Sequence, residues 1–135
     1  MTDISTSLPA ARRPLLRPAL KLDAVVTGAN GAAYLAAAGP IGDLLGLSAP
    51  LLRGVGAFLL AYAALVWLTG ARRAIPRAPV LAIVAGNAAW AAGSIVAAIA
   101  GWGDPTTAGT VWIVMQAIVV AGFAELQLTG LRRDG

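Results

Sequence analysis

The chain contains no cysteine and no histidine. Their absence excludes disulfides, thiolate metal sites, histidine-ligated haem and any catalysis that depends on either side chain. Charge is also scarce, because only 12% of the 135 residues are Asp, Glu, Lys or Arg. A typical soluble domain carries about 25% charged residues, so this chain cannot cover a water-facing surface with them.

What fills the chain instead is hydrophobic sequence, which makes up 59% of it. The stretch from Val80 to Ala100 contains no charged residue. At about 1.5 Å of rise per residue it can cross the roughly 30 Å hydrocarbon core of a bilayer. A water-exposed helix of this length would need a polar face, which this stretch lacks. We expect an all-α protein, an integral membrane four-helix bundle.

The expected helices span residues of about 19–38, 51–69, 80–100 and 107–128, all within a transmembrane domain of 19–131. The Gly39-Pro40 pair is expected to end the first helix. Residues 1–18 contain three prolines and are expected to form a disordered basic tail, and 132–135 a short C-terminus. A basic segment before an apolar run is also typical of a signal peptide, with 36–38 as its cleavage site. That alternative fits poorly with three further apolar runs.

The basic residues predict an orientation. All of them except Arg53 fall in the tail or just after it at Lys21, in the 70–79 loop and at the C-terminus, which share one side if four helices span. Asp43 and Asp104 fall on the other side. By the positive-inside rule both termini face the cytoplasm of a cell membrane. Short basic clusters at the ends of apolar runs indicate contact with lipid, and we expect no nucleic-acid partner.

An internal repeat accompanies this pattern. The sequence LTGARR at 68–73 recurs as LTGLRR at 128–133, and Asn30 has a counterpart in Asn87. One interpretation is that the chain consists of two tandem helical hairpins related by a pseudo-repeat. The axis that relates the two hairpins would then run along the membrane normal. Coincidence in an Ala-, Leu- and Gly-rich sequence is the other interpretation.

Polar residues three or four positions apart form stripes on two of the expected helices, so each set shares one helical face. One interpretation is hydrogen bonding between helices, and ladders of small residues such as Gly28 and Gly93 would let the backbones approach closely. The other is a polar pocket near the midplane, to which Tyr62 and Gln116 would add. The stripes consist of Asp23, Thr27, Asn30 and Tyr34 in the first helix and of Asn87, Trp90 and Ser94 in the third.

Asp23 and Glu125 are carboxylates inside expected membrane helices. A charge costs on the order of 2.5 to 3.5 kcal/mol at the bilayer centre and often marks a proton or substrate path. Each also has a structural explanation, through nearby basic residues or a helix terminus. In the last helix Gln116 and Gln127 share a face while Glu125 points away, so one set is expected to face a partner chain or the headgroups.

The chain as a whole resembles the small four-span membrane proteins of unknown function of high-GC bacteria. The segments that carry this resemblance are LDAVVTGANGAAYLAAAGP, LLRGVGAFLLAYAALVW and DPTTAGTVWIVMQA. It implies a fold but no activity. Size and span number also resemble the small multidrug resistance transporters, whose first helix carries a carboxylate. Asp23 is the one candidate match, and it lies nearer the interface, while the rest of that pattern is missing.

Two functions follow as expectations. The first is a non-enzymatic bundle that binds a lipid, a small ligand or a protein partner, alone or as a homo-oligomer. The second is a small transporter or channel subunit in which Asp23 or Glu125 titrates. We expect no enzyme, no cofactor and no metal, because phosphate-binding loops, nucleophile motifs and metal-ligand clusters are missing from the sequence.

Overall fold

The computed structural model describes residues 14–134, and in this part of the chain every regular element is a helix. Residues 1–13 of the predicted basic tail lie outside the described residues, and its last three residues, 16–18, are not disordered but belong to the first helix. The all-helical class is confirmed. The five helices are α2 (Leu16–Ala36), α3 (Ala38–Leu45), α4 (Ala49–Ala71), α5 (Arg77–Ala100) and α6 (Thr107–Asp134).

Three of these helices, α4, α5 and α6, are long and apolar enough to cross a membrane. Their outward faces carry bare hydrocarbon, as at Ile99 and Ile118, which are 83% and 65% exposed. Contiguous apolar surface of this kind requires lipid rather than water. The chain is therefore a membrane protein with three apolar helices of spanning length. Helix α2 is not among the three, because Lys21, Asp23 and Asn30 lower its hydropathy.

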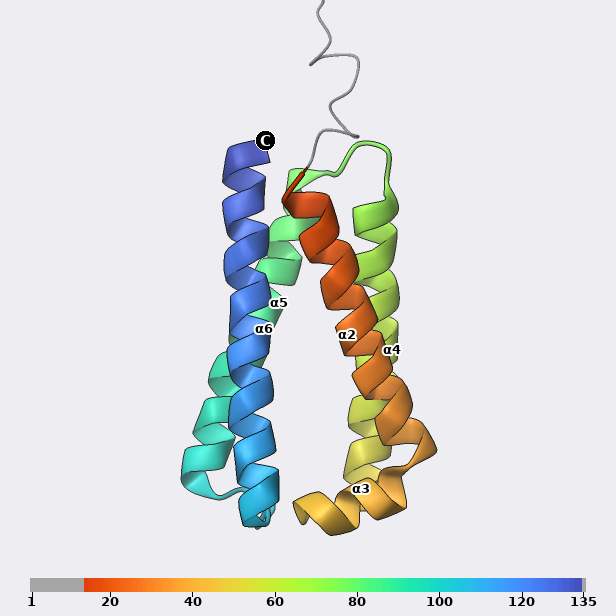
Figure 1. Cartoon of the computed structure of the whole chain (residues 1–135), viewed down its shortest axis with the longest axis vertical. Coiled ribbons are helices and arrows are strands. Elements are labelled where there is room, and N and C mark those ends of the chain that lie inside the picture. The colour runs from red at the N-terminus through yellow and green to blue at the C-terminus, as the bar shows by residue number, and fades with distance from the viewer. Residues whose placement is uncertain (1–13, 135) are drawn as a thin grey trace, which may run out of the picture.

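The long helices form two hairpins, which meet at one end of the molecule and diverge towards the other (Figure 1). Helix α2 packs mainly on α4, and α5 packs mainly on α6. The hairpins are joined chiefly through α2 and α6, whereas the backbones of α4 and α5 come close at few positions. The start of α2, the α4–α5 loop and the C-terminus lie at the closed end, and α3 lies across the open end (Figure 1).

Several helix boundaries differ from the sequence-based expectation. Helix α2 already begins at Leu16, and a new helix, α3, begins at Ala38 and runs through Gly39-Pro40 instead of stopping there. Pro18 and Pro40 both lie in the first turn of their helices, where a backbone N–H has no helical acceptor to lose. Helix α6 continues beyond residue 128 to Asp134.

At the closed end, the start of α2 lies between the ends of α4 and α6. A Cβ atom at Gly70 would lie 3.0 Å from Leu20 Cβ, and one at Gly130 would lie 2.8 Å from Leu16 Cα. Both glycines belong to the repeated Leu-Thr-Gly sequence, which thus allows two helices to approach α2 closely. The apolar core around this contact consists of Leu16, Leu20, Ala24, Val66, Ile75, Val80, Ile83 and Leu131.

At the open end, Thr106 ties α3 to the beginning of α6. Its backbone N–H donates to the carbonyl of Leu45 at 3.0 Å, and its hydroxyl donates to the carbonyl of Leu44 at 2.8 Å. The same hydroxyl accepts from the N–H of Gly109 at 3.0 Å and so caps α6. These bonds connect the two hairpins at the end where their helices are farthest apart.

Helices α2 and α4 cross at a pair of glycines. A Cβ at Gly31 would lie 2.8 Å from the carbonyl oxygen of Gly56, and a Cβ at Gly56 would lie 2.7 Å from that of Gly31. Of the predicted ladder residues, Gly28 faces Ala63, but a Cβ at Gly93 on α5 would meet open space. Small residues therefore allow close packing within the first hairpin. The close contact lies at Gly31 and does not extend along the whole expected ladder.

We predict that Gly31→Ala destabilises the fold by about 2–3 kcal/mol, because its methyl group would meet backbone that cannot move aside. Gly93→Ala is the matched control, since nothing lies within 4 Å of its Cβ position. The free energy of unfolding in mixed detergent micelles, followed by circular dichroism, measures both. Equal stability of the two variants would contradict the close crossing of α2 and α4.

Candidate functional site

A buried carboxylate lies between the hairpins, near their closed end. Asp23 of α2 is only 1% exposed. Its Oδ1 accepts from the Thr27 hydroxyl at 2.8 Å. Its Oδ2 accepts from Asn87 Nδ2 at 2.9 Å and from Gln127 Nε2 at 2.7 Å. In the part of the chain that the structure describes, these three donors and no cation hold the carboxyl group.

The amides that reach Asp23 also bond each other and α4. Asn87 Nδ2 donates a second bond, to Gln127 Oε1 at 3.0 Å. Asn87 Oδ1 accepts from the Tyr62 hydroxyl at 3.0 Å. The same hydroxyl lies 2.9 Å from the carbonyl oxygen of Ile83. Gln127 is fully buried and Asn87 is 3% exposed. We call these five side chains, Asp23, Thr27, Tyr62, Asn87 and Gln127, the polar node.

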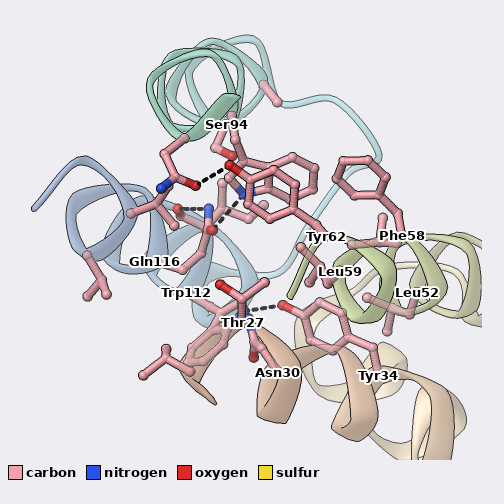
Figure 2. A pocket seen from close by; sticks show the side chains of 18 of the residues that line it. Thr27, Asn30, Tyr34, Leu52, Phe58, Leu59, Tyr62, Ser94, Trp112 and Gln116 are labelled. Carbon is pink, nitrogen blue, oxygen red and sulfur yellow. Dashed lines mark hydrogen bonds between the residues drawn. The ribbon is translucent and has the colours of Figure 1, made fainter. Parts of the chain in front are cut away.

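A cavity of about 710 Å³ lies between the hairpins (Figure 2). Its lining runs from the polar node to Leu47, which lies just beyond α3. All four long helices contribute to its wall, and no charged side chain lines it. Thr27, Tyr62 and Asn87 form its boundary with the node, so Asp23 lies directly behind the wall. Among the other lining residues are Asn30, Tyr34, Leu47, Leu52, Val55, Phe58, Leu59, Trp90, Ser94, Trp102, Trp112, Ile113, Gln116, Val120 and Phe123.

Two tryptophans in the wall are fixed by hydrogen bonds. Trp90 Nε1 donates to Gln116 Oε1 at 2.9 Å, and Trp112 Nε1 donates to the Tyr34 hydroxyl at 2.6 Å. Each bond joins different helices, α5 to α6 and α6 to α2. Because the indole N–H groups are already paired, the rings offer the cavity their apolar faces.

The predicted site residues divide cleanly. Thr27, Asn30, Tyr34, Tyr62, Asn87, Ser94 and Gln116 all line one cavity. Asp23 is bonded to two of them. Glu125 does not belong to this group, because it is exposed on the outer face of α6.

Sequence reasoning left out of the site some residues that the structure places there. Gln127 bonds Asp23 directly, and its spacing from Gln116 already showed that the two share a face. Phe58 stacks on Trp90, with ring centroids 5.9 Å apart, and carries no polar signal that could have marked it in an apolar helix. Trp112 likewise could not be assigned to the interior rather than to an interfacial belt.

Within residues 14–134 there is no cluster of three His, Cys, Asp or Glu side chains that could hold a metal ion. No family model, curated protein sequence or solved structure matches the chain. Its chemistry therefore has to be inferred from the polar node and the cavity.

We predict that Asp23→Asn costs about 1 kcal/mol and Asp23→Leu about 3 kcal/mol of stability. The amide can place its oxygen at the Oδ2 position and its nitrogen opposite Thr27, whose hydroxyl can turn to accept. Leucine instead leaves the Gln127 N–H without an acceptor in a buried site. Unfolding in mixed micelles measures both, and Glu125→Gln, on an exposed side chain, is expected to change little. A larger effect of Glu125→Gln than of Asp23→Leu would contradict this assignment.

Proposed function

We propose that this protein is a non-enzymatic, multi-pass membrane protein that binds one lipophilic small molecule between its two hairpins. The observation that carries the proposal is the cavity, whose volume of about 710 Å³ falls within the roughly 300–1,000 Å³ of small-molecule sites. Its wall is mostly aliphatic and aromatic, with a few polar groups that could orient a ligand. That combination is typical of a binding site and not of a solvent-filled channel.

The same proposal includes four membrane crossings. Helix α2 has 21 residues, enough to cross with α4, on which it packs. Its polar side chains Asp23 and Thr27 face the node, whereas Leu22 and Val25 on its outer face are 54% and 57% exposed. An apolar outer face with a polar inner face supports a helix that crosses lipid next to protein.

The proposed orientation places both termini in the cytoplasm of a bacterial cell. Basic side chains gather at the closed end, where Lys21 Nζ lies 5.0 Å from the centre of the Trp67 ring. Trp102, at the opposite end of α5, is 63% exposed. Aromatic residues at both ends support a membrane crossing, and the excess of cations at the closed end, with Arg53 alone at the other, supports this orientation.

The wall indicates a ligand whose buried part is uncharged. Because no lining residue carries a formal charge, a charged group inside the cavity would lose its hydration without gaining a counter-ion. Ser94 and Asn30 both reach the cavity and bring hydroxyl and amide groups to it (Figure 2). These groups suit a hydroxyl, ester or carbonyl on an otherwise apolar molecule.

We expect Ser94→Trp to weaken binding severalfold, because the indole would project into the cavity and occupy part of its volume. Protein purified in a mild detergent is extracted with organic solvent, and bound lipophilic molecules are counted by mass spectrometry. The wild type is expected to retain one molecule per chain. Gly93→Trp, at the neighbouring outward position, is the control that should retain it. Equal retention by the Ser94→Trp and Gly93→Trp variants would contradict binding in this cavity.

A second candidate function, proton-coupled transport of such a molecule, is favoured by the Asp23–Thr27 pair. When Asp23 is ionised the Thr27 hydroxyl donates to it, and when Asp23 is protonated that hydroxyl can turn and accept. The pair therefore suits both protonation states without moving a helix. Since Thr27 also lines the cavity, a proton has a short route between ligand and carboxylate.

This candidate predicts proton uptake into liposomes when the bound molecule is supplied on one side. Asp23→Asn should abolish the flux while leaving the cavity occupied, because the amide keeps the node but cannot titrate. Glu125→Gln should leave flux intact. Undiminished flux in the Asp23→Asn protein would rule out Asp23 as the coupling group. Absence of flux in the wild type would rule out transport and leave ligand binding as the proposed function.

A further inference from the structure

A second, shallower pocket of about 480 Å³ lies on the side of the molecule formed by α4 and α5. Two of its residues, Pro50 and Gly54, belong only to it. The remaining four, Leu51, Val55, Phe58 and Trp90, also line the main cavity. The same four side chains thus lie between the outer pocket and the main cavity.

The position of this pocket follows from the packing of the hairpins. The backbones of α4 and α5 come close at few positions, so mainly side chains close the space between them. These are Tyr62 and Val66 near the node, and the stacked rings of Phe58 and Trp90 farther towards α3. A Cβ at Gly54 would meet nothing within 4 Å, which leaves the outer rim open. In a membrane, this side of the bundle faces hydrocarbon.

We infer that the cavity is loaded sideways from the bilayer, between α4 and α5, and that the occupant is the hydrocarbon chain of a membrane phospholipid. This inference rests on the proposed function and specifies its ligand and its route. A chain can enter while its headgroup stays at the membrane surface, which fits a cavity wall without charge. A water-soluble molecule would instead have to pass α3 and Trp102 at the open end.

Phe58 and Trp90 form the gate of this route. Their rings stack with centroids 5.9 Å apart and an interplanar angle of 17°. Trp90 is held by its bond to Gln116, whereas Phe58 has no polar anchor and is 53% exposed. Rotation of the Phe58 side chain would therefore connect the outer pocket with the cavity and leave Trp90 in place.

The gate also selects a leaflet. Pro50 to Phe58 occupy the first turns of α4, which begin beside α3 at the end remote from the arginine-rich loop. A chain entering there comes from the leaflet next to α3. The core around Leu20 and Val66 closes the other end of the gap between the hairpins.

Quenching of tryptophan fluorescence by brominated lipid tests this route. Trp67, Trp90 and Trp102 are replaced by Phe, which keeps an aromatic ring at position 90 of the gate and leaves Trp112 in the cavity wall as the single reporter. A matched variant keeps only Trp67, which is 43% exposed on the outside. Both proteins are freed of bound lipid in detergent and reconstituted into vesicles of dibrominated phosphatidylcholine.

As the vesicles form on removal of detergent, we expect Trp112 to become quenched, and Gly54→Phe to slow that quenching about twofold or more, because the ring fills the outer pocket that must admit the chain. Quenching of Trp67 should not change. Gly93→Phe, the control, adds the same ring at another open position of the lipid-facing surface and should leave both signals unaltered.

Trp112 quenching that Gly54→Phe leaves unchanged would overturn the route through α4 and α5. If the Gly54→Phe protein, tested by solvent extraction, then still carries one lipophilic molecule, binding in the cavity stands and only the route is wrong. If neither quenching nor a bound molecule is found in the wild type, the proposed function fails together with the inference.

Discussion

The structure depends on one buried carboxylate and the three donors that satisfy it. Asp23 is only 1% exposed, so water cannot hydrogen-bond it and its partners have to come from the protein. Thr27 lies one turn further along the same helix, but Asn87 and Gln127 come from the other hairpin. Removing either amide would leave a buried acceptor poorly paired, so the node fixes α2 against α5 and α6.

That constraint acts at one end only, and the cavity is its consequence. Near the node, glycines at 70 and 130 let α4 and α6 close around the start of α2. Towards α3 the hairpins diverge (Figure 1), and aromatic side chains line the space without filling it. The cavity and the shallower pocket beside α4 both follow from hairpins tied together at one end.

Much of this could be predicted from sequence, because hydrophobic runs and helical periodicity are local properties. The stripe from Asp23 to Tyr34 faces the interior, where the cost of polar groups in lipid places it. Periodicity also separated Gln127 from Glu125, but it could not tell which of them faces inward. Helix α3 and the crossing at Gly31 were not predicted, since both depend on how separate segments pack. The cavity depends on the distance between hairpins, which no residue pattern encodes.

The measurement that tests this account most directly is a double-mutant cycle between Asp23 on α2 and Gln127 on α6. Unfolding free energies of the Asp23→Leu, Gln127→Leu and doubly substituted proteins are compared with that of the wild type. If the node joins the hairpins, the coupling energy between the two substitutions is about 1 kcal/mol or more. The reason is that the second substitution removes a side chain whose hydrogen-bond partner is already gone. Additivity within about 0.3 kcal/mol would contradict direct contact between the two side chains, and with it the account of how the hairpins are held together.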